Sequence, residues 1–216
     1  MSTKAAIFDM DGTTLSTLDD IANAVNYTLQ QFGQPTRPKE EIVKYLGNGS
    51  RWIWENFFPG DDDRIDHYLA VYSEYYRGHC AICTRPYDGI LDMLRNLRDK
   101  GIKVAIVSNK PDFAVQPLCE EHFPGLIDFA CGERPGIRRK PHPDSVYECL
   151  NKLGVDRSEA VYIGDSEVDV DTAKNSGLPC LAVSWGFRSV ETLRKAGAEK
   201  IFSSVKNLEK EILQSS

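Results

Sequence analysis

The feature that most constrains the fold of this chain is a repeated alternation of short apolar runs with stretches of helical period. Runs of this length, largely apolar, are typical of strands buried on both faces of a parallel sheet. Helical stretches between such strands provide the crossover connections that parallel pairing requires. The sequence therefore predicts an α/β protein with a doubly wound parallel sheet. The predicted strands are 5–8, 103–107, 126–131, 160–163, 179–183 and 200–202, and the helices between the later ones are 87–101, 111–122, 143–153, 168–176 and 190–196.

This alternation is interrupted directly after the first strand by a block that carries helical signals only. Four short helices are predicted there, at 17–32, 39–46, 52–58 and 61–78. We expect residues 1–16 and 82–216 to form a Rossmann-like core and residues 17–81 to form an inserted all-α cap domain. An insert at this point lies over the carboxyl edge of the sheet, where it can open and close as a lid.

Composition and charge exclude several classes of protein. Charged residues make up 27% and hydrophobic residues 41% of the 216 residues, as in ordinary globular domains. The net charge of −6 argues against a nucleic-acid partner, which would require a basic face. No apolar run is long enough to span a bilayer, and Asp9 follows Met1 too closely for a secretory signal. We expect a cytoplasmic protein, as a monomer or homodimer, without a membrane partner.

The six cysteines include one Cys-x-x-Cys pair, formed by Cys80 and Cys83. A structural zinc site needs four ligands, usually from a second pair, and no second pair follows. A redox function of this pair stays open as the alternative. We expect reduced thiols that pack as small apolar side chains.

The first predicted strand ends in two carboxylates, Asp9 and Asp11, followed at once by Gly12. Unpaired buried charge is very costly, so a buried strand that ends in two acids requires a partner for them. Ligands of open α/β sheets bind at the carboxyl ends of the strands. We interpret the two aspartates as facing a polar pocket that holds a cation. The alternative is an ordinary turn, in which Asp and Gly are common.

Three further predicted strands or connections end in polar side chains. Ser108 and Asn109 follow the strand 103–107, Asp165 and Asp169 follow the strand 160–163, and Lys140 precedes the helix that begins at 143. A strand-to-helix turn at Ser108 would present free N–H groups to a phosphate. Each residue alone also fits a structural role, as a helix cap, a loop lysine or a surface acid. Their joint position at the ends of separate strands favours one shared site.

These residues carry a resemblance to a known family. The chain resembles the haloacid dehalogenase-like phosphatases over essentially its full length. Their four motifs are matched by Asp9-Met10-Asp11-Gly12-Thr13, by Ser108 with Asn109, by Lys140, and by Gly164-Asp165 with Asp169. Within the family the chain is similar to the phosphoglycolate phosphatases, which share the helical insert and a tryptophan-glycine-aromatic stretch like Trp185-Gly186-Phe187. It departs from them at Ser16, where an acid is usual, and this bears on the substrate more than on the reaction.

The resemblance implies a magnesium-dependent phosphatase that acts on a small phosphorylated metabolite. It implies that Asp9 attacks phosphorus and forms an aspartyl-phosphate, and that Asp11 is the general acid and base. Mg²⁺ would be held by the carboxylates of Asp9 and Asp165 and the carbonyl of Asp11, with Asp169 supporting this shell. Ser108 and Lys140 would hold the phosphoryl oxygens.

Substrate contacts are expected from both parts of the chain. In the insert, a glycine-rich loop with an arginine suits a small anion, although an interhelical turn would have the same composition. We choose Gly47, Asn48, Gly49 and Arg51 there as the residues that face the substrate. The predicted substrate-binding residues are Thr13, Ser108, Asn109, Lys140, Gly49 and Arg51.

Other functions share parts of this pattern. Within the same superfamily, a pyrophosphatase or a phosphosugar mutase similar to β-phosphoglucomutase would use the same pair, Asp9 and Asp11. A dehalogenase is disfavoured, because halide displacement needs neither Asp11 nor a cation. A non-catalytic phosphate-binding protein is the alternative from another class, and the intact set of carboxylates argues against it.

Overall fold

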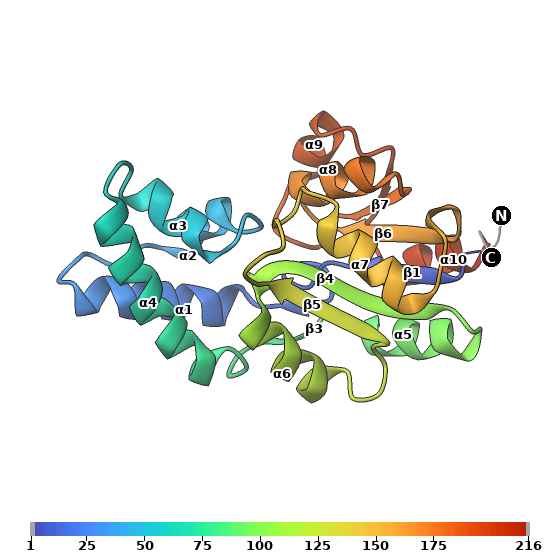
Figure 1. The fold of residues 1–216 in the computed structure, drawn as a ribbon, viewed down its shortest axis with the longest axis horizontal. Helices are drawn as coiled ribbons and strands as arrows, with labels where there is room; N and C mark the ends of the chain where they lie inside the picture. The colour runs from blue at the N-terminus through green and yellow to red at the C-terminus, as the bar shows by residue number, and fades with distance from the viewer. Residues whose placement is uncertain (1–2, 215–216) are drawn as a thin grey trace.

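A six-stranded sheet with helices on both faces forms one part of the molecule, and a group of helices extends from one end of it (Figure 1). The structure is a computed structural model that describes residues 3–214. The strand order is β5-β4-β1-β6-β7-β8, and every neighbouring pair is parallel. The predicted fold class is therefore confirmed. The strands are β1 (Ala5–Phe8), β4 (Lys103–Pro111), β5 (Phe129–Glu133), β6 (Ala160–Gly164), β7 (Cys180–Val183) and β8 (Lys200–Phe202).

The central strand β1 fixes where the polar strand ends meet. All four of its residues are fully buried, as its apolar sequence requires. Phe8 is in register with Ile106 of β4 on one side and with Ile163 of β6 on the other. The backbone N–H of Asp9 donates to the carbonyl of Ile163 at 2.8 Å. The residues that follow β1, β4 and β6 therefore lie side by side at one edge of the sheet.

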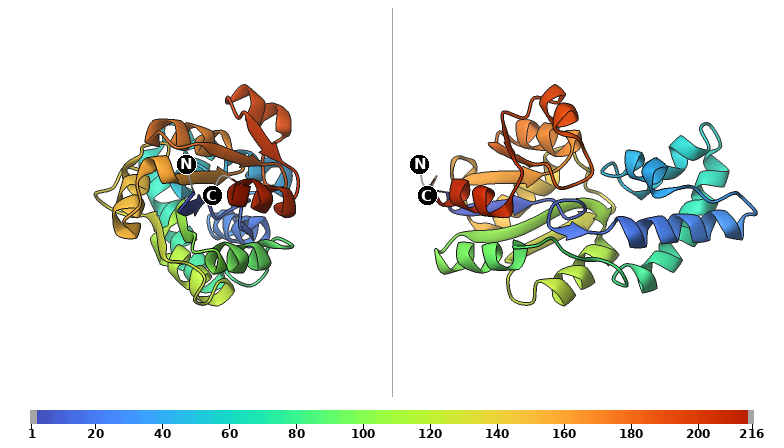
Figure 2. Two further views of the ribbon diagram at one scale, coloured as in Figure 1. Left: turned by 90° about the vertical axis from the view of Figure 1, so that its right-hand side faces the viewer. Right: turned by 180° about the vertical axis from the view of Figure 1, so that it is seen from behind.

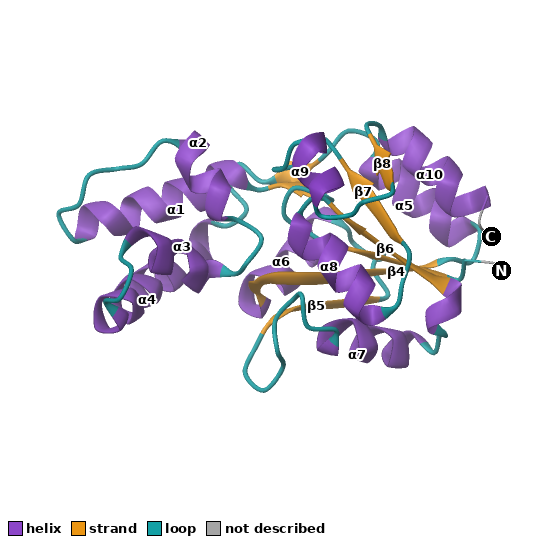
Figure 3. Cartoon of the chain, turned by 90° about the horizontal axis from the view of Figure 1, so that it is seen from above, coloured by secondary structure: helices purple, strands orange, loops and turns teal. Residues whose placement is uncertain are grey.

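Helices cover both faces of the sheet because alternate residues of each strand point to opposite sides. The helices of this part are α5 (Ile90–Asp99), α6 (Asp112–His122), α7 (Asp144–Leu153), α8 (Glu167–Ser176), α9 (Val190–Lys195) and α10 (Val205–Gln214). Phe8, Ile106 and Ile163 belong to a core cluster that includes residues of α5, α6 and α10, whereas Ile7 and Val107 belong to a second cluster with α7. Figure 3 shows α5 and α10 on one side of the sheet and α7 on the other.

The helical block follows the first strand, as its sequence indicates, and extends beyond the carboxyl ends of the strands (Figure 2). Its core is aromatic: Trp54 is fully buried, with ring centroids 5.3 Å from Tyr68 and 6.0 Å from Tyr72. The same hydrophobic cluster continues into the sheet part. The division of the chain into core and cap domains stays a prediction. The helices are α1 (Leu18–Gln31), α2 (Lys39–Ile42), a 3₁₀ turn (Val43–Tyr45), α3 (Ser50–Phe57) and α4 (Asp62–His79).

The structure differs from the sequence-based prediction at several boundaries. Strand β4 continues through Ser108 and Asn109 to Pro111, so Ser108 does not lie at a strand-to-helix turn. The pairing with β5 is irregular there, because the register shifts between Val107, which pairs with Cys131, and Pro111, which pairs with Glu133. Helix α5 begins three residues later than predicted, after Gly89, whose φ of +85° is left-handed.

The prediction lacked a pair of short strands and a helix after the last strand. A short antiparallel pair, β2 (Leu15–Ser16) with β3 (Arg85–Pro86), joins the chain where it enters and leaves the helical block. Helix α10 follows the last strand and packs on α5. Between residues 3 and 214, no helix has both the length and the apolar character needed to cross a membrane.

Candidate active site

Lys140 is the centre of a buried cluster at the carboxyl edge of the sheet. Its ammonium donates to Asp9 Oδ1 at 2.9 Å, to Asp169 Oδ1 at 2.8 Å and to the Tyr162 hydroxyl at 3.0 Å. The hydroxyl of Tyr162 donates in turn to the carbonyl of Val107 at 3.1 Å. Side chains from three separate segments thus contact the ammonium of Lys140. The positions of these residues in the sequence only suggested that they meet. Tyr162 was missed because it occupies an inward-facing position of an apolar strand.

Three carboxylates lie together beside this lysine. Asp9, Asp165 and Asp169 each offer an oxygen, and these three oxygens are within 4.8 Å of one another. Asp165 accepts hydrogen bonds from the Thr13 hydroxyl at 2.9 Å and from the Phe187 N–H at 2.7 Å. These two hydrogen bonds hold the Asp165 carboxylate in position.

Asp169 is oriented by the start of α8. Its Oδ2 accepts from the Ser166 hydroxyl at 2.6 Å and from the Ser166 N–H at 3.1 Å, which together form a capping box. Its Oδ1 remains on Lys140. Both carboxylate oxygens of Asp169 therefore accept hydrogen bonds within the protein.

Charge balance tests whether this donor set fits a divalent cation. Burial raises the pKa of Asp9 to about 6, with Lys140 opposing this and Asp169 and Asp11 adding to it. Burial raises the pKa of Asp165 well above its usual range, and the charges of Asp169 and Asp9 add to this. Burial alone would lower the pKa of Lys140, but Asp169 and Asp9 hold it above its ordinary value. Three carboxylates against one ammonium leave two uncompensated negative charges, and hard oxygen donors suit Mg²⁺. The residues fit such an ion.

The raised pKa of Asp9 predicts how stability depends on pH in the absence of metal. Asp9 ionises near pH 3.8 in the unfolded chain and near 6 in the folded protein. Between these values the folded state holds a proton that the unfolded state has released, so stability falls as pH rises, by at most about 3 kcal/mol. Mg²⁺ should therefore raise the melting temperature more at pH 7 than at pH 4.5. Thermal unfolding with Mg²⁺ and with chelator at both pH values measures this, and an equal shift at both would contradict it.

Two glycines make room for Asp165. A Cβ on Gly12 would overlap its carboxylate, and φ at Gly12 is +84°. A Cβ on Gly186 would overlap Asp165 Oδ2 and the carbonyl of Gly12. The backbone therefore approaches this carboxylate from two sides, which only residues without a side chain allow.

We expect Gly186→Ala to lower the rate of phosphate release and the affinity for Mg²⁺ by about 10- to 100-fold, because the new methyl group displaces Asp165. The matched control is Gly78→Ala in α4, where a Cβ has no heavy atom within 4 Å. Initial rates across a magnesium titration compare the two variants. Equal rates for both variants at every magnesium concentration would show that Asp165 is not held by this close approach.

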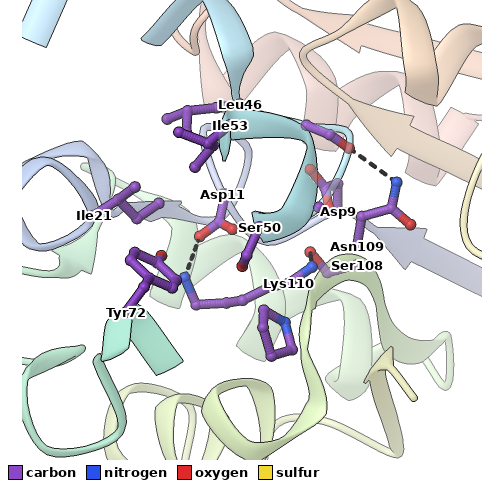
Figure 4. Close-up of a pocket in the computed structure, with 13 residues that line it drawn as sticks. Asp9, Asp11, Ile21, Leu46, Ser50, Ile53, Tyr72, Ser108, Asn109 and Lys110 are labelled. Atoms are coloured by element: carbon purple, nitrogen blue, oxygen red, sulfur yellow. Dashed lines mark hydrogen bonds and ion pairs between the residues drawn. The ribbon is translucent and has the colours of Figure 1, made fainter. Parts of the chain in front are cut away.

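A small cavity lies beside Asp9, between residues of the sheet and residues of the helical block (Figure 4). Six residues predicted for the site line it: Asp9, Asp11, Gly47, Gly49, Ser108 and Asn109. Lys140, Asp165 and Asp169 form the buried cluster around Asp9 instead.

The side chain of Asn109 is fully used within the protein. Its Nδ2 donates to the carbonyls of Gly47 and Lys140, both at 2.9 Å, and its Oδ1 accepts from the Lys140 N–H at 2.8 Å. It therefore holds the loop that carries Lys140 and the loop of the insert. Any substrate contact from Asn109 would have to come from its backbone.

Three expected substrate contacts are not supported by the structure. The hydroxyl of Thr13 is bound to Asp165 and Thr13 does not line the cavity. Asn48 does not line it either. Arg51 forms ion pairs with three carboxylates of the insert, Glu55, Asp62 and Asp66, because helix α3 directs its side chain along α4. A glycine loop with an arginine indicated an anion site, but nearby acids of the insert bind that arginine.

Lys110 is the cavity residue that sequence reasoning missed. Its ammonium donates to Asp11 Oδ1 at 2.9 Å and to the Tyr76 hydroxyl at 2.6 Å. It directly follows Ser108 and Asn109, so its position in the chain was a usable signal. It was overlooked because the resemblance assigned the lysine of the site to Lys140 and used only Ser108 and Asn109 from this run.

The carboxyl edge of this parallel sheet holds an Asp-x-Asp pair, a second acidic segment and a buried lysine. This arrangement is typical of hydrolases that transfer a phosphoryl group. Residues 6–183 match the family of haloacid dehalogenase-like hydrolases. The chain belongs to this family and is a phosphoric monoester hydrolase, as its similarity to phosphoglycolate phosphatases also indicates.

Three relatives illustrate this similarity. A solved structure of a candidate phosphoglycolate phosphatase from Lactobacillus delbrueckii subsp. bulgaricus is 45% identical, with a TM-score of 0.93 over 99% of each chain. Phosphoglycolate phosphatase 1 of Pseudomonas aeruginosa is 27% identical, over 95% of this chain and 78% of its own length. The phosphoglycolate phosphatase of Aquifex aeolicus is 29% identical, over 85% of this chain and 86% of its own length.

Proposed function

We propose that the protein hydrolyses small phosphate monoesters in a Mg²⁺-dependent reaction through an aspartyl-phosphate, with 2-phosphoglycolate as the candidate substrate. The observation that carries this proposal is the position of Asp9, which reaches the cavity while Lys140 holds one of its oxygens. The relatives named as phosphoglycolate phosphatases support the choice of substrate.

In the proposed reaction, a carboxylate oxygen of Asp9 forms a bond to phosphorus while the bond from phosphorus to the leaving oxygen breaks. Asp11, two residues further on and also at the cavity, gives its proton to the leaving alcohol. It then takes a proton from the water that attacks the aspartyl-phosphate. Inorganic phosphate leaves and Asp9 is regenerated.

The developing charge on the phosphoryl oxygens requires donors that are already in place. Ser108 is buried, lines the cavity and lies beside Asp9, so its hydroxyl is one such donor. Lys140 supplies a fixed positive charge behind Asp9. Magnesium would be held by Asp9 and Asp165 and the carbonyl of Asp11, where it would offset the charge of the carboxylates and the phosphoryl group.

The helical block closes the cavity in this proposal. Ile21, Leu46 and Ile53 of the block line the side opposite to the sheet. Arg188, in the loop between β7 and α9, connects the sheet part to the block. Its side chain donates to the carbonyls of Val43 at 3.0 Å and Leu46 at 2.7 Å. Closure of this kind excludes water from the reacting atoms.

Initial phosphate release from a panel of phosphate esters tests the proposal. The panel contains 2-phosphoglycolate, hexose phosphates, pyrophosphate and an aryl phosphate, each with Mg²⁺ and with chelator. Chelator-sensitive release that is fastest from 2-phosphoglycolate is expected. Interconversion of sugar phosphate isomers without release would favour the mutase, and binding of phosphate without any turnover would favour a non-catalytic protein. Either result would overturn the proposal.

A further inference from the structure

Lys110 is a buried cation in the wall of the cavity that the proposed reaction does not yet use. Its side chain is 2% exposed, between Asp11 and Tyr76, and its ammonium lies 4.7 Å from the centre of the Tyr76 ring. A lysine buried to this degree is costly unless its N–H groups are satisfied. Its hydrogen bonds therefore indicate what the site is built to hold.

An ammonium group has three N–H donors. Within residues 3–214, Lys110 has two hydrogen-bond acceptors, Asp11 Oδ1 and the Tyr76 hydroxyl. Because Lys110 lines the cavity, its third donor is placed to bind a group that enters there. That group should be an anion, since Asp11 alone balances the charge of Lys110 and has its own proposed part in proton transfer.

The two ends of the cavity differ in chemistry. Figure 4 shows Asp9, Ser108 and Asn109 at one end, and the tip of Lys110 beside Asp11 towards Tyr72 and Ile21 at the other. The first end takes the phosphoryl group in the proposed reaction. The second end therefore receives the leaving alcohol.

The leaving-group end is small and mostly apolar apart from Lys110 and its partners. The cavity encloses about 30 Å³, which is room for no more than a few water molecules. Its apolar wall of Ile21, Leu46 and Ile53 suits a methylene group. A sugar carries several hydroxyl groups for which this apolar wall offers few partners, whereas a leaving group of one or two carbons can pack against it.

We propose that Lys110 recognises an anionic group on the leaving alcohol, within one or two carbons of the phosphoryl oxygen, and that this group is a carboxylate. The inference rests on the proposed phosphatase function and names the substrate class of that same site. Binding of this anion by Lys110 places the leaving oxygen next to Asp11, because the lysine bridges the two.

The test compares substrates that differ in this anion. 2-Phosphoglycolate carries a carboxylate, propyl phosphate has similar length without one, and pyrophosphate carries a phosphate in its place. The wild-type protein, Lys110→Met and Lys103→Met are compared by kcat/KM on each substrate. Lys103 is the matched control, since it lies in the same strand at the opposite end and is exposed.

The wild-type protein should prefer 2-phosphoglycolate to propyl phosphate. Because Lys110 also touches Asp11, Lys110→Met lowers both rates, but the loss on 2-phosphoglycolate should be about 10- to 100-fold greater. Lys103→Met should keep the wild-type preference. If the wild-type protein preferred pyrophosphate to 2-phosphoglycolate and Lys110→Met removed this preference, Lys110 would still recognise an anionic leaving group. The proposal that this anion is a carboxylate would then be wrong.

The outcomes separate this inference from the proposed function. Equal losses on all substrates in Lys110→Met would overturn recognition by Lys110 and leave the phosphatase intact, with Lys110 only positioning Asp11. Chelator-sensitive release without any preference for an anionic leaving group would do the same. No release by the wild-type protein from any substrate would overturn both.

Discussion

Replacing Asp9 with asparagine is expected to reduce phosphate release by about 10⁴-fold or more, the scale seen when an enzyme loses its nucleophile. The amide cannot form the acyl-phosphate bond, yet its oxygen can still accept from Lys140, which lies 2.9 Å from Asp9 Oδ1. Binding and folding should therefore survive while turnover is lost. Initial rates with 2-phosphoglycolate measure the loss, and calorimetric titration with phosphate in Mg²⁺ measures the retained binding.

Asp99→Asn is the matched control for this variant, because Asp99 is exposed at the end of α5, away from the cavity. It should release phosphate at the wild-type rate. Normal turnover in Asp9→Asn would remove the aspartyl-phosphate mechanism. Loss of both turnover and phosphate binding would instead assign Asp9 to binding rather than to attack.

Replacing Lys140 with methionine is expected to have the largest effect on stability. Lys140 is 2% exposed and is bound to Asp9 and Asp169, whose side chains are also buried. Without the ammonium, these carboxylates keep uncompensated charge, which costs about 3–5 kcal/mol of unfolding free energy in chelator at pH 7. Phosphate release should fall by about 10³-fold, because one fixed donor to the developing charge is gone.

Urea unfolding in chelator measures this change, with Lys174→Met, an exposed lysine of α8, as the control. The deficit should shrink as pH falls below about 6, since protonation of Asp9 removes part of the excess charge. Mg²⁺ should offset part of the deficit at pH 7. A stability unchanged by Lys140→Met at both pH values would show that this ion-pair cluster does not contribute to folding.

The polar ends of the strands were readable from the sequence because each follows an apolar run within a few residues. Asp9, Asp11, Ser108, Asp165 and Asp169 lie where parallel pairing of these runs would bring them. Lys140 follows no such run and was identified from the resemblance to the family. This works because local hydrophobic pattern marks a buried strand, and the carboxyl ends of parallel strands share one edge.

The residues of the insert that face the cavity were harder to predict from the sequence. Its helices follow from their periodicity, but the direction of Arg51 depends on acids in a later helix, Asp62 and Asp66, which compete for its charge. Gly49 was chosen with Arg51 from the same loop and does line the cavity. Composition of a loop therefore indicated an anion site, while helix packing decided which residues face it.

The sequence by itself determined the parallel α/β architecture, the site of the helical insert and the set of acids at the sheet edge, because these depend on local periodicity and on strand polarity. Only the tertiary structure decided that Lys110 is buried against Asp11 and Tyr76, residues 99 and 34 positions away in the chain. It also decided that the Asn109 side chain holds two loops and that Gly12 and Gly186 enclose Asp165. These contacts join stretches that are far apart in the chain, and such long-range packing has no signature in any one stretch of sequence.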